Sequence, residues 1–162
     1  MQPMKYHMRR GERSLNEWSV YEEILLAGKY ATIALAWNNE PYVVTLSYGY
    51  DRIERSLYFH CAKQGLKTEL IRCNPSACLT IVEDKGYIQN ECAHSYRSLV
   101  IRGKIQVITD DSRKQKGVDV LINHLERSPE VMKMKLPQKK ATFDSMNIWK
   151  LTVDEISGKG GQ

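Results

Sequence analysis

Two apolar segments separated by a pair of asparagines are the feature that most constrains the fold of this chain. Residues 30–37 and 42–50 are short, rich in aromatic and aliphatic side chains, and typical of β-strands. Asn38-Asn39 between them suits a tight turn, because asparagine tolerates the positive φ angles that short hairpins require. The sequence therefore predicts an antiparallel β-hairpin.

Further strand-like segments follow, with few helices between them. Strands are predicted over residues 56–61, 77–83, 96–108 and 147–153, with a polar loop over 84–93 and a bulge at Gly103. Helices are predicted after the capping box Ser14-x-x-Glu17, ending at Gly28, and over 65–73 and 111–125, the last capped by Asp110 or Asp111. Strands and helices do not alternate, which disfavours a parallel doubly wound sheet. The fold class predicted is mainly β with flanking helices, a six-stranded antiparallel barrel.

Length and composition predict a single cytoplasmic domain. The 162 residues fit one domain over 1–162, with a polar N-terminal arm at 1–13 and a loose, glycine-rich tail at 157–162. The first residues lack the apolar stretch of a secretory signal, and no apolar run is long enough to span a membrane. Much of the net charge of +5 lies in a basic segment at 133–140, predicted to be a solvated loop. No aromatic residues interleave these lysines, so a nucleic-acid partner is not expected.

The four cysteines predict neither a metal site nor a disulfide framework. Cys61, Cys73, Cys78 and Cys92 form no C-x-x-C pair, and their spacing matches no common zinc pattern. Cys92 and His94 would supply only two ligands. We expect reduced thiols and no metal.

The segment from Ser56 to Asn74-Pro75 carries the clearest functional signal. A strand ends in a polar turn that opens a helix, with Lys63 and Lys67 near the start of that helix. Free backbone N–H groups and the helix dipole already favour an anion there. The two interpretations that remain are a phosphate site and a solvated basic turn.

The order of these segments resembles the flavin-binding split-barrel family, which includes the pyridoxamine-phosphate oxidases. The matching stretches are Tyr42 to Tyr50, Tyr58 to Lys67, Asn74-Pro75, and His94 to Val100 with Gly103. Met8-Arg9-Arg10 and Ile156 to Lys159 make the chain more similar to the branch of 5-nitroimidazole reductases. The resemblance covers nearly the whole chain.

The resemblance implies a homodimer of six-stranded split barrels that binds FMN in clefts between the subunits. Members place a strand backbone against the flavin ring, the next strand end against the ribityl chain and phosphate, and basic residues on the phosphate. The cofactor-binding residues implied are Val43, Val44, Thr45, Leu46, His60, Cys61, Lys63, Lys67, Arg97 and Ser98.

The same resemblance implies an FMN-dependent oxidoreductase. FMN would take electrons from a donor such as NAD(P)H and pass them to a small organic acceptor, including nitroaromatics, with His60 as the catalytic residue. Leu66 stands where pyridoxamine-phosphate oxidases carry an arginine, which disfavours that substrate. The alternatives are a pyridoxamine-phosphate-oxidase-type or deazaflavin-dependent enzyme, or a non-catalytic flavin or haem binder with His7, His94 or His124 as axial ligand.

Several of these residues also have structural interpretations. His60 would be a half-buried histidine satisfied by a carbonyl, Cys61 a packing residue, and Arg97 a surface partner of Tyr96. Tyr48 and Tyr50 face one side of a strand and would cover the barrel. Trp149 would close a core layer or form a wall of the flavin cleft of the neighbouring subunit.

Overall fold

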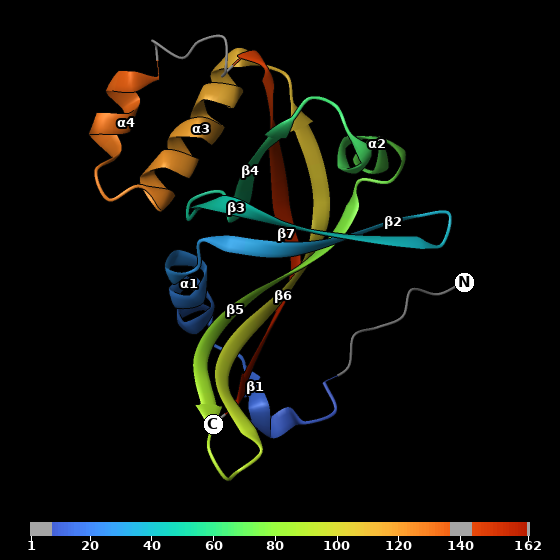
Figure 1. The fold of residues 1–162 in the computed structure, drawn as a ribbon, viewed down its shortest axis with the longest axis vertical. Coiled ribbons are helices and arrows are strands. Elements are labelled where there is room, and N and C mark those ends of the chain that lie inside the picture. The colour runs from blue at the N-terminus through green and yellow to red at the C-terminus, as the bar shows by residue number, and fades with distance from the viewer. Residues whose placement is uncertain (1–7, 137–143, 162) are drawn as a thin grey trace.

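A computed structural model describes residues 8–136 and 144–161 (Figure 1). Its strands are β1 (Ser14–Leu15), β2 (Tyr30–Trp37), β3 (Glu40–Asp51), β4 (Ser56–Ala62), β5 (Ser76–Ile88), β6 (Ala93–Ile108) and β7 (Met146–Gly161). Its helices are the 3₁₀ turn η1 (Gly11–Arg13), α1 (Trp18–Ala27), α2 (Leu66–Cys73), α3 (Asp111–Leu125) and α4 (Pro129–Lys135).

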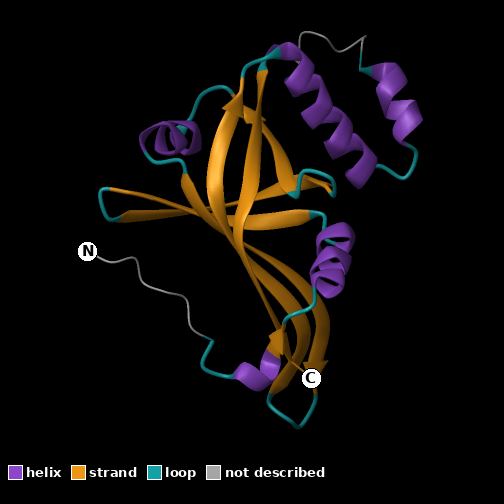
Figure 2. Ribbon diagram, turned by 180° about the vertical axis from the view of Figure 1, so that it is seen from behind, coloured by secondary structure: helices purple, strands orange, loops and turns teal. Residues whose placement is uncertain are grey.

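The strands form one antiparallel sheet that closes on itself. Their order is β1-β7-β4-β3-β2-β5-β6, and β6 also pairs with β7. Strands β2 to β7 therefore make a six-stranded ring, while β1 adds a short edge to β7 (Figure 2). The predicted fold class, a mainly β split barrel with flanking helices, is confirmed.

The hairpin of β2 and β3 forms as the two asparagines predict. Asn38 and Asn39 have φ angles of 51° and 64°, and the pairing runs from Trp37 opposite Glu40 to Tyr30 opposite Ser47. From Tyr48 onward β3 pairs with β4 instead. Residues 40–47 of β3 therefore have no partner in β4, and this end of the hairpin projects from the barrel as an arm (Figure 1).

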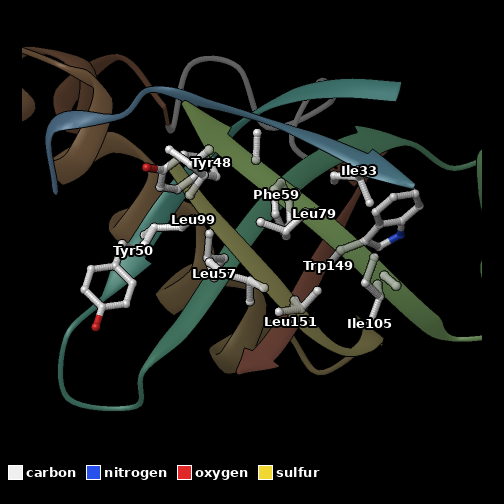
Figure 3. Packing of buried hydrophobic residues seen from close by; sticks show 14 of the residues in the cluster. Ile33, Tyr48, Tyr50, Leu57, Phe59, Leu79, Leu99, Ile105, Trp149 and Leu151 are labelled. Atoms are coloured by element: carbon white, nitrogen blue, oxygen red, sulfur yellow. The ribbon is translucent and has the colours of Figure 1, made fainter. Parts of the chain in front are cut away.

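The barrel interior is filled by large apolar and aromatic side chains (Figure 3). Trp149 is fully buried, so it closes a core layer, one of its two predicted roles. Tyr48 and Tyr50, predicted to share one face of a strand and to cover the barrel, are 0% and 6% exposed and lie in its core. The hydroxyl of Tyr48 donates to the carbonyl of Leu25 at 2.7 Å, which satisfies its polar atom inside the core.

The helices occupy different sides of the barrel. Helices α1 and α2 contribute Leu25 and Ile71 to the main core, whereas α3 packs outside, where Tyr58 and Ile148 join a second cluster. Figures 1 and 2 place α2 on the opposite side of the upper barrel from α3 and α4. None of the described helices is long and apolar enough to cross a membrane.

The N-terminal capping box was predicted wrongly. Helix α1 begins at Trp18, and Glu17 at its N-cap makes no side-chain capping bond. Ser14 instead lies in β1, opposite Lys159 of β7, and its hydroxyl donates to Asn16 at 2.7 Å. Pairing with a distant strand therefore determines the conformation of Ser14.

The prediction of a loose tail from residue 157 is also wrong, because β7 continues to Gly161 and pairs there with β6. A Cβ on Gly158 would lie 2.5 Å from a ring carbon of Tyr21. The glycine therefore permits close packing of an aromatic ring rather than disorder. Residue 162 lies outside the described residues, as do residues 1–7 of the predicted N-terminal arm.

Other segments predicted as loops also lie partly in strands or helices. Strands β5 and β6 extend into the predicted loop at 84–93, leaving a short turn with positive φ at Asn90 and Cys92. The bulge predicted at Gly103 is confirmed by a register shift against β7 between Arg102 and Gly103. The first residues of the predicted basic loop, 133–135, belong instead to α4 (Pro129–Lys135), and residues 137–143 lie outside the described residues.

His124 of α3 gives the fold a measurable pH dependence. Its Nε2 donates to the carbonyl of Gly28 at 2.6 Å, and its ring lies 5.0 Å from that of Tyr48. Burial lowers the pKa of His124, with a further lowering by Lys29 and an opposing effect of the Gly28 hydrogen bond. The unfolded chain therefore binds more protons near the usual histidine pKa of about 6.5, so this stability is present above that pH and decreases below it.

We expect the free energy of unfolding of the wild type to fall more between pH 7.5 and 5.5 than that of His124→Gln, which cannot titrate. The slope difference is at most about 1.4 kcal/mol per pH unit for one proton. Urea unfolding across this range measures it, and parallel pH profiles would contradict the assignment.

Candidate functional site

The turn between β4 and α2 forms an open, positively charged end of the barrel wall. Gly65 precedes α2 with φ 120° and ψ 165°, a conformation that is essentially restricted to glycine. Its carbonyl accepts from Thr68 and Glu69 at 3.0 and 3.2 Å. The N–H groups of the first two residues of α2 have no acceptor among the described residues, so they point a partial positive charge at solvent.

Lys63 and Lys67 lie at this turn, and neither forms an ion pair with a described carboxylate. Two other lysines, by contrast, form ion pairs: Lys116 and Lys150 contact Glu54 at 2.5 and 2.6 Å. The hydrogen bond from Lys116 helps to lower the pKa of Glu54 to about 2. Lys63 and Lys67 therefore remain available for an anion.

Cys61 faces the core beside this turn. It is 5% exposed, and burial raises the pKa of its thiol to about 11, although Lys67 lowers it in part. The thiol stays protonated at neutral pH, which is the behaviour of a packing residue and not of a nucleophile. Its side chain packs in the main core at the end of β4.

His60 faces the opposite way. Successive residues of a strand point to opposite faces, so His60 shares the outer face of β4 with Tyr58. The imidazole is exposed and has no described hydrogen-bond partner, so the interpretation of a carbonyl-satisfied, half-buried histidine does not hold. It borders an apolar pocket beneath α3 and α4.

The segment Val43–Leu46 alternates between the two faces of β3. Val44 and Leu46 pack against the core, whereas Val43 is 59% exposed and Thr45 faces outward. The hydroxyl of Thr45 lies 3.1 Å from that of Thr32 on β2. The sheet register places a row of side chains across four strands on this outer face, Thr45, Thr32, Thr80 and Val100.

Arg97 and Ser98 lie far from the β4–α2 turn within one chain. Arg97 is held by Glu83 at 2.5 Å and Glu23 at 2.9 Å, and these carboxylates raise its pKa. Ile105 of the same strand borders a groove with Lys63, and the rise along β6 from Arg97 to Ile105 is roughly 26 Å. Ser98 shares the outer face of β6 with Val100, at the end occupied by Arg97.

The structure therefore brings together His60, Cys61, Lys63 and Lys67 and leaves Arg97 and Ser98 apart. Val43–Leu46 lie in the half of β3 that pairs with β2, before its pairing with β4 begins at Tyr48. The sequence reasoning missed the outward threonines of β2 and β5 and the apolar contribution of α4. Ser128-Pro129 was a usable signal for α4, because proline is favoured in the first turn of a helix.

The described residues contain no group of three or more metal-ligating side chains, and the four cysteines are free thiols. Of the histidines considered as haem ligands, His94 lies 3.5 Å from Asp84, and His124 donates to Gly28. His7 lies outside the described residues.

Comparison with known proteins agrees with this architecture. Residues 17–160 match a family described as pyridoxamine 5'-phosphate oxidase. The chain therefore belongs to the pyridoxamine 5'-phosphate oxidase family. Comparison with curated proteins found no match.

Solved structures share the fold. A Bacteroides thetaiotaomicron protein assigned to 5-nitroimidazole antibiotic resistance is 24% identical, with a TM-score of 0.72 over 90% of this chain and 85% of that one. The flavocytochrome Anf3 of Azotobacter vinelandii is 17% identical, with a TM-score of 0.82 over 97% and 73%. An FAD-binding protein of Mesorhizobium loti is 21% identical, with a TM-score of 0.67 over 93% and 98%.

Gly65 offers a test of the turn geometry. We expect Gly65→Ala to lower the free energy of unfolding by about 1–3 kcal/mol, because alanine is strained at this φ and ψ. Gly11→Ala is the matched control, since a Cβ there meets no atom within 4 Å. Urea unfolding of both variants measures the difference, and equal stabilities would show that the turn accepts alanine without strain.

Proposed function

We propose that the protein is an FMN-binding flavoprotein that reduces a small organic acceptor as a homodimer. The observation that carries the proposal is the pair of unpaired lysines beside the free N–H groups at the start of α2. Membership of the pyridoxamine 5'-phosphate oxidase family and a fold shared with an FAD-binding protein support a flavin at this place.

The residues present fit a flavin phosphate. Lys67 and Lys63 supply two cations near the start of α2, and the first N–H groups of that helix add neutral donors. The space beside Gly65 is open, since no atom lies within 4 Å of a Cβ built there. A phosphate needs this combination of charge and several hydrogen-bond donors.

When bound, FMN supplies hydride and electron transfer between a donor such as NAD(P)H and the acceptor. The protein's part is to hold the phosphate at α2 and to present polar groups to the reacting molecules. His60 lies three residues before Lys63 on the exposed face of β4, so we assign it the exchange of a proton or hydrogen bond with the acceptor.

A second copy of the chain would complete the site. Val43 and Val82 are 59% and 55% exposed on the outer face that carries the row from Thr45 to Val100. The described part of the chain leaves this face uncovered, which favours an interface with a partner. A two-fold contact through it would bring β6 residues such as Ser98 of one subunit toward the cofactor of the other.

Lys67→Ala tests the phosphate assignment. We expect it to weaken FMN binding about tenfold to a hundredfold and riboflavin binding much less, because a charge-assisted bond contributes roughly 1.5–3 kcal/mol. Quenching of flavin fluorescence measures both affinities, with FAD as a further ligand to compare.

Lys133→Ala is the control, because that lysine lies on α4, away from α2 (Figure 1), and already pairs with Glu130. Equal losses for FMN and riboflavin would remove Lys67 from the phosphate site. Absence of quenching by the wild type at high micromolar protein would overturn flavin binding itself.

Val43→Lys tests the subunit interface. We expect light scattering to give twice the monomer mass for the wild type and the monomer mass for Val43→Lys, because a buried unpaired charge opposes association. Ile53→Lys is the matched control at a 94% exposed position in the turn between β3 and β4. A wild type that is monomeric and still binds FMN tightly would contradict the shared site.

A further inference from the structure

A groove of about 620 Å³ opens at one end of the barrel, between α2 and the neighbouring ends of β6 and β7. Its strand residues belong to the inner face of the barrel, because Ile105 and Val107 pack with the main core and Asn147 lies directly opposite the inward-facing Cys61. The groove is therefore the mouth of the barrel, partly covered by α2. The other side chains along it that matter here are Lys63, Thr68, Ile71, Arg72 and Gln106.

The mouth has a closed, apolar floor. Trp149 lies directly opposite Val107 and is fully buried, and Figure 3 shows its ring beside Ile105. The barrel below is filled by the main core, so the groove ends there and does not run on as a channel. A polar group of a ligand that reached this floor would lose its hydration, so the inner end of a ligand must be apolar.

Helix α2 turns one face toward the mouth. Thr68, Ile71 and Arg72 have the i, i+3, i+4 spacing of side chains that share a face of a helix. Ile71 is 3% exposed, and the hydroxyl of Thr68 donates to the carbonyl of Ala62 at 3.3 Å. The side chain of Arg72, by contrast, is 70% exposed. The helix therefore presents an apolar surface inside the groove and a cation at its rim.

The charge along the groove has one sign. Lys63 forms no ion pair with a described carboxylate, and no carboxylate lines the groove among the described residues. Arg72 pairs with Glu69 at 2.9 Å, but both side chains are exposed, and its guanidinium carries five N–H donors, so it can also hold a second anion. Gln106 and Asn147 add amide groups on the strand side. The rim therefore suits a negatively charged group.

The apolar part of the lining favours a flexible chain over a flat ring. It consists of Ile71, Pro75, Ile105 and Val107, and no aromatic side chain lines the groove among the described residues. A ring would find no aromatic partner for stacking, whereas an aliphatic chain can pack against branched side chains. The volume lies within the range of roughly 300–1,000 Å³ typical of small-molecule sites, which form preferentially at places such as the mouths of barrels.

We propose that the barrel mouth binds a free aliphatic carboxylate of medium chain length. The carboxylate lies at the rim with Lys63 and Arg72. The hydrocarbon chain enters the mouth and packs against Ile71, Ile105 and Val107. The site is a second ligand site of the protein and does not depend on the proposed flavin function.

Isoleucine methyl groups provide the first test. Octanoate is the probe, added to protein labelled with ¹³C at its isoleucine δ1 methyls. We expect shifts at Ile71 and Ile105, and none at Ile53 in the turn between β3 and β4 or at Ile122 beneath α3. Equal shifts at all four, or no shift at Ile71 and Ile105, would overturn the proposal. Because these shifts need no flavin, they decide this site whether or not the protein binds FMN.

Two further probes separate the chain from the charge. Hexanoate is shorter than octanoate by two methylenes, and each buried methylene adds about two- to fourfold in affinity, so we expect octanoate to bind about four- to sixteenfold more tightly. Octylammonium has the same chain with the opposite charge and should bind at least about tenfold more weakly than octanoate. Equal affinities in either comparison would overturn the proposal.

Substitutions at the rim test the cations. We expect Lys63→Gln and Arg72→Gln each to lower the octanoate affinity about two- to fivefold, and the double variant about four- to twenty-fivefold. Arg52→Gln is the matched control, an exposed arginine in the turn between β3 and β4 with one ion pair, to Glu22. Lys67 does not line the groove, so Lys67→Gln should change the affinity less than Lys63→Gln. A loss as large would place the carboxylate at the start of α2 and overturn the proposal.

Val107→Trp fills the mouth, and Val131→Trp places the same ring at a 46% exposed position on α4 as a control. We expect octanoate to bind at least about tenfold more weakly to Val107→Trp than to Val131→Trp, because the larger side chain occupies the space of the hydrocarbon chain. Unchanged affinity in a folded Val107→Trp would overturn the proposal. Where that variant does not fold, the substitutions at the exposed rim keep the test decisive.

Discussion

Closure of the sheet by β6 and β7 is the interaction on which the rest of the structure depends. The two strands pair from Tyr96 opposite Gly161 to Ile108 opposite Ile148, and their residues are far apart in the sequence. Without this pairing β7 would lose one of its two long neighbours, and Trp149 would lose the enclosed core in which it is fully buried. Burial of the interior side chains supplies the driving force, and the ladder satisfies the backbone groups that this burial removes from water.

The closed ring fixes the candidate site through strand alternation. Strand β4 lies between β3 and β7, so its two faces are the barrel interior and the surface beneath α3. Cys61 therefore points inward and becomes inert, whereas His60 points outward toward the pocket. The end of the same strand leads to Lys63 and to the N-terminus of α2. One strand thus carries the packing residue, the imidazole and the basic turn.

Some cationic side chains of the described residues are paired with carboxylates, and others are not. Arg97, Lys116 and Lys150 are each held by carboxylates, and these contacts tie β6, α3 and β7 to their neighbours. Lys63 and Lys67 have no such described partner and lie at the uncapped start of α2. An anionic ligand at that turn would pair with two cations that no described carboxylate contacts. The proposed function therefore depends on these two lysines and not on Arg97.

The sequence by itself determined the local elements: the Asn38-Asn39 hairpin, the helix capped by Asp110, the bulge at Gly103 and the basic turn at α2 are each encoded within a few residues. It also determined the family resemblance, and with it the fold class. Only the tertiary structure decided that Ser14 and Gly158 lie in paired strands, that Tyr48 is buried, and that Arg97 is bound by two carboxylates. These features depend on partners distant in the chain, and short-range propensity and spacing carry no information about which distant residue will fill a given space.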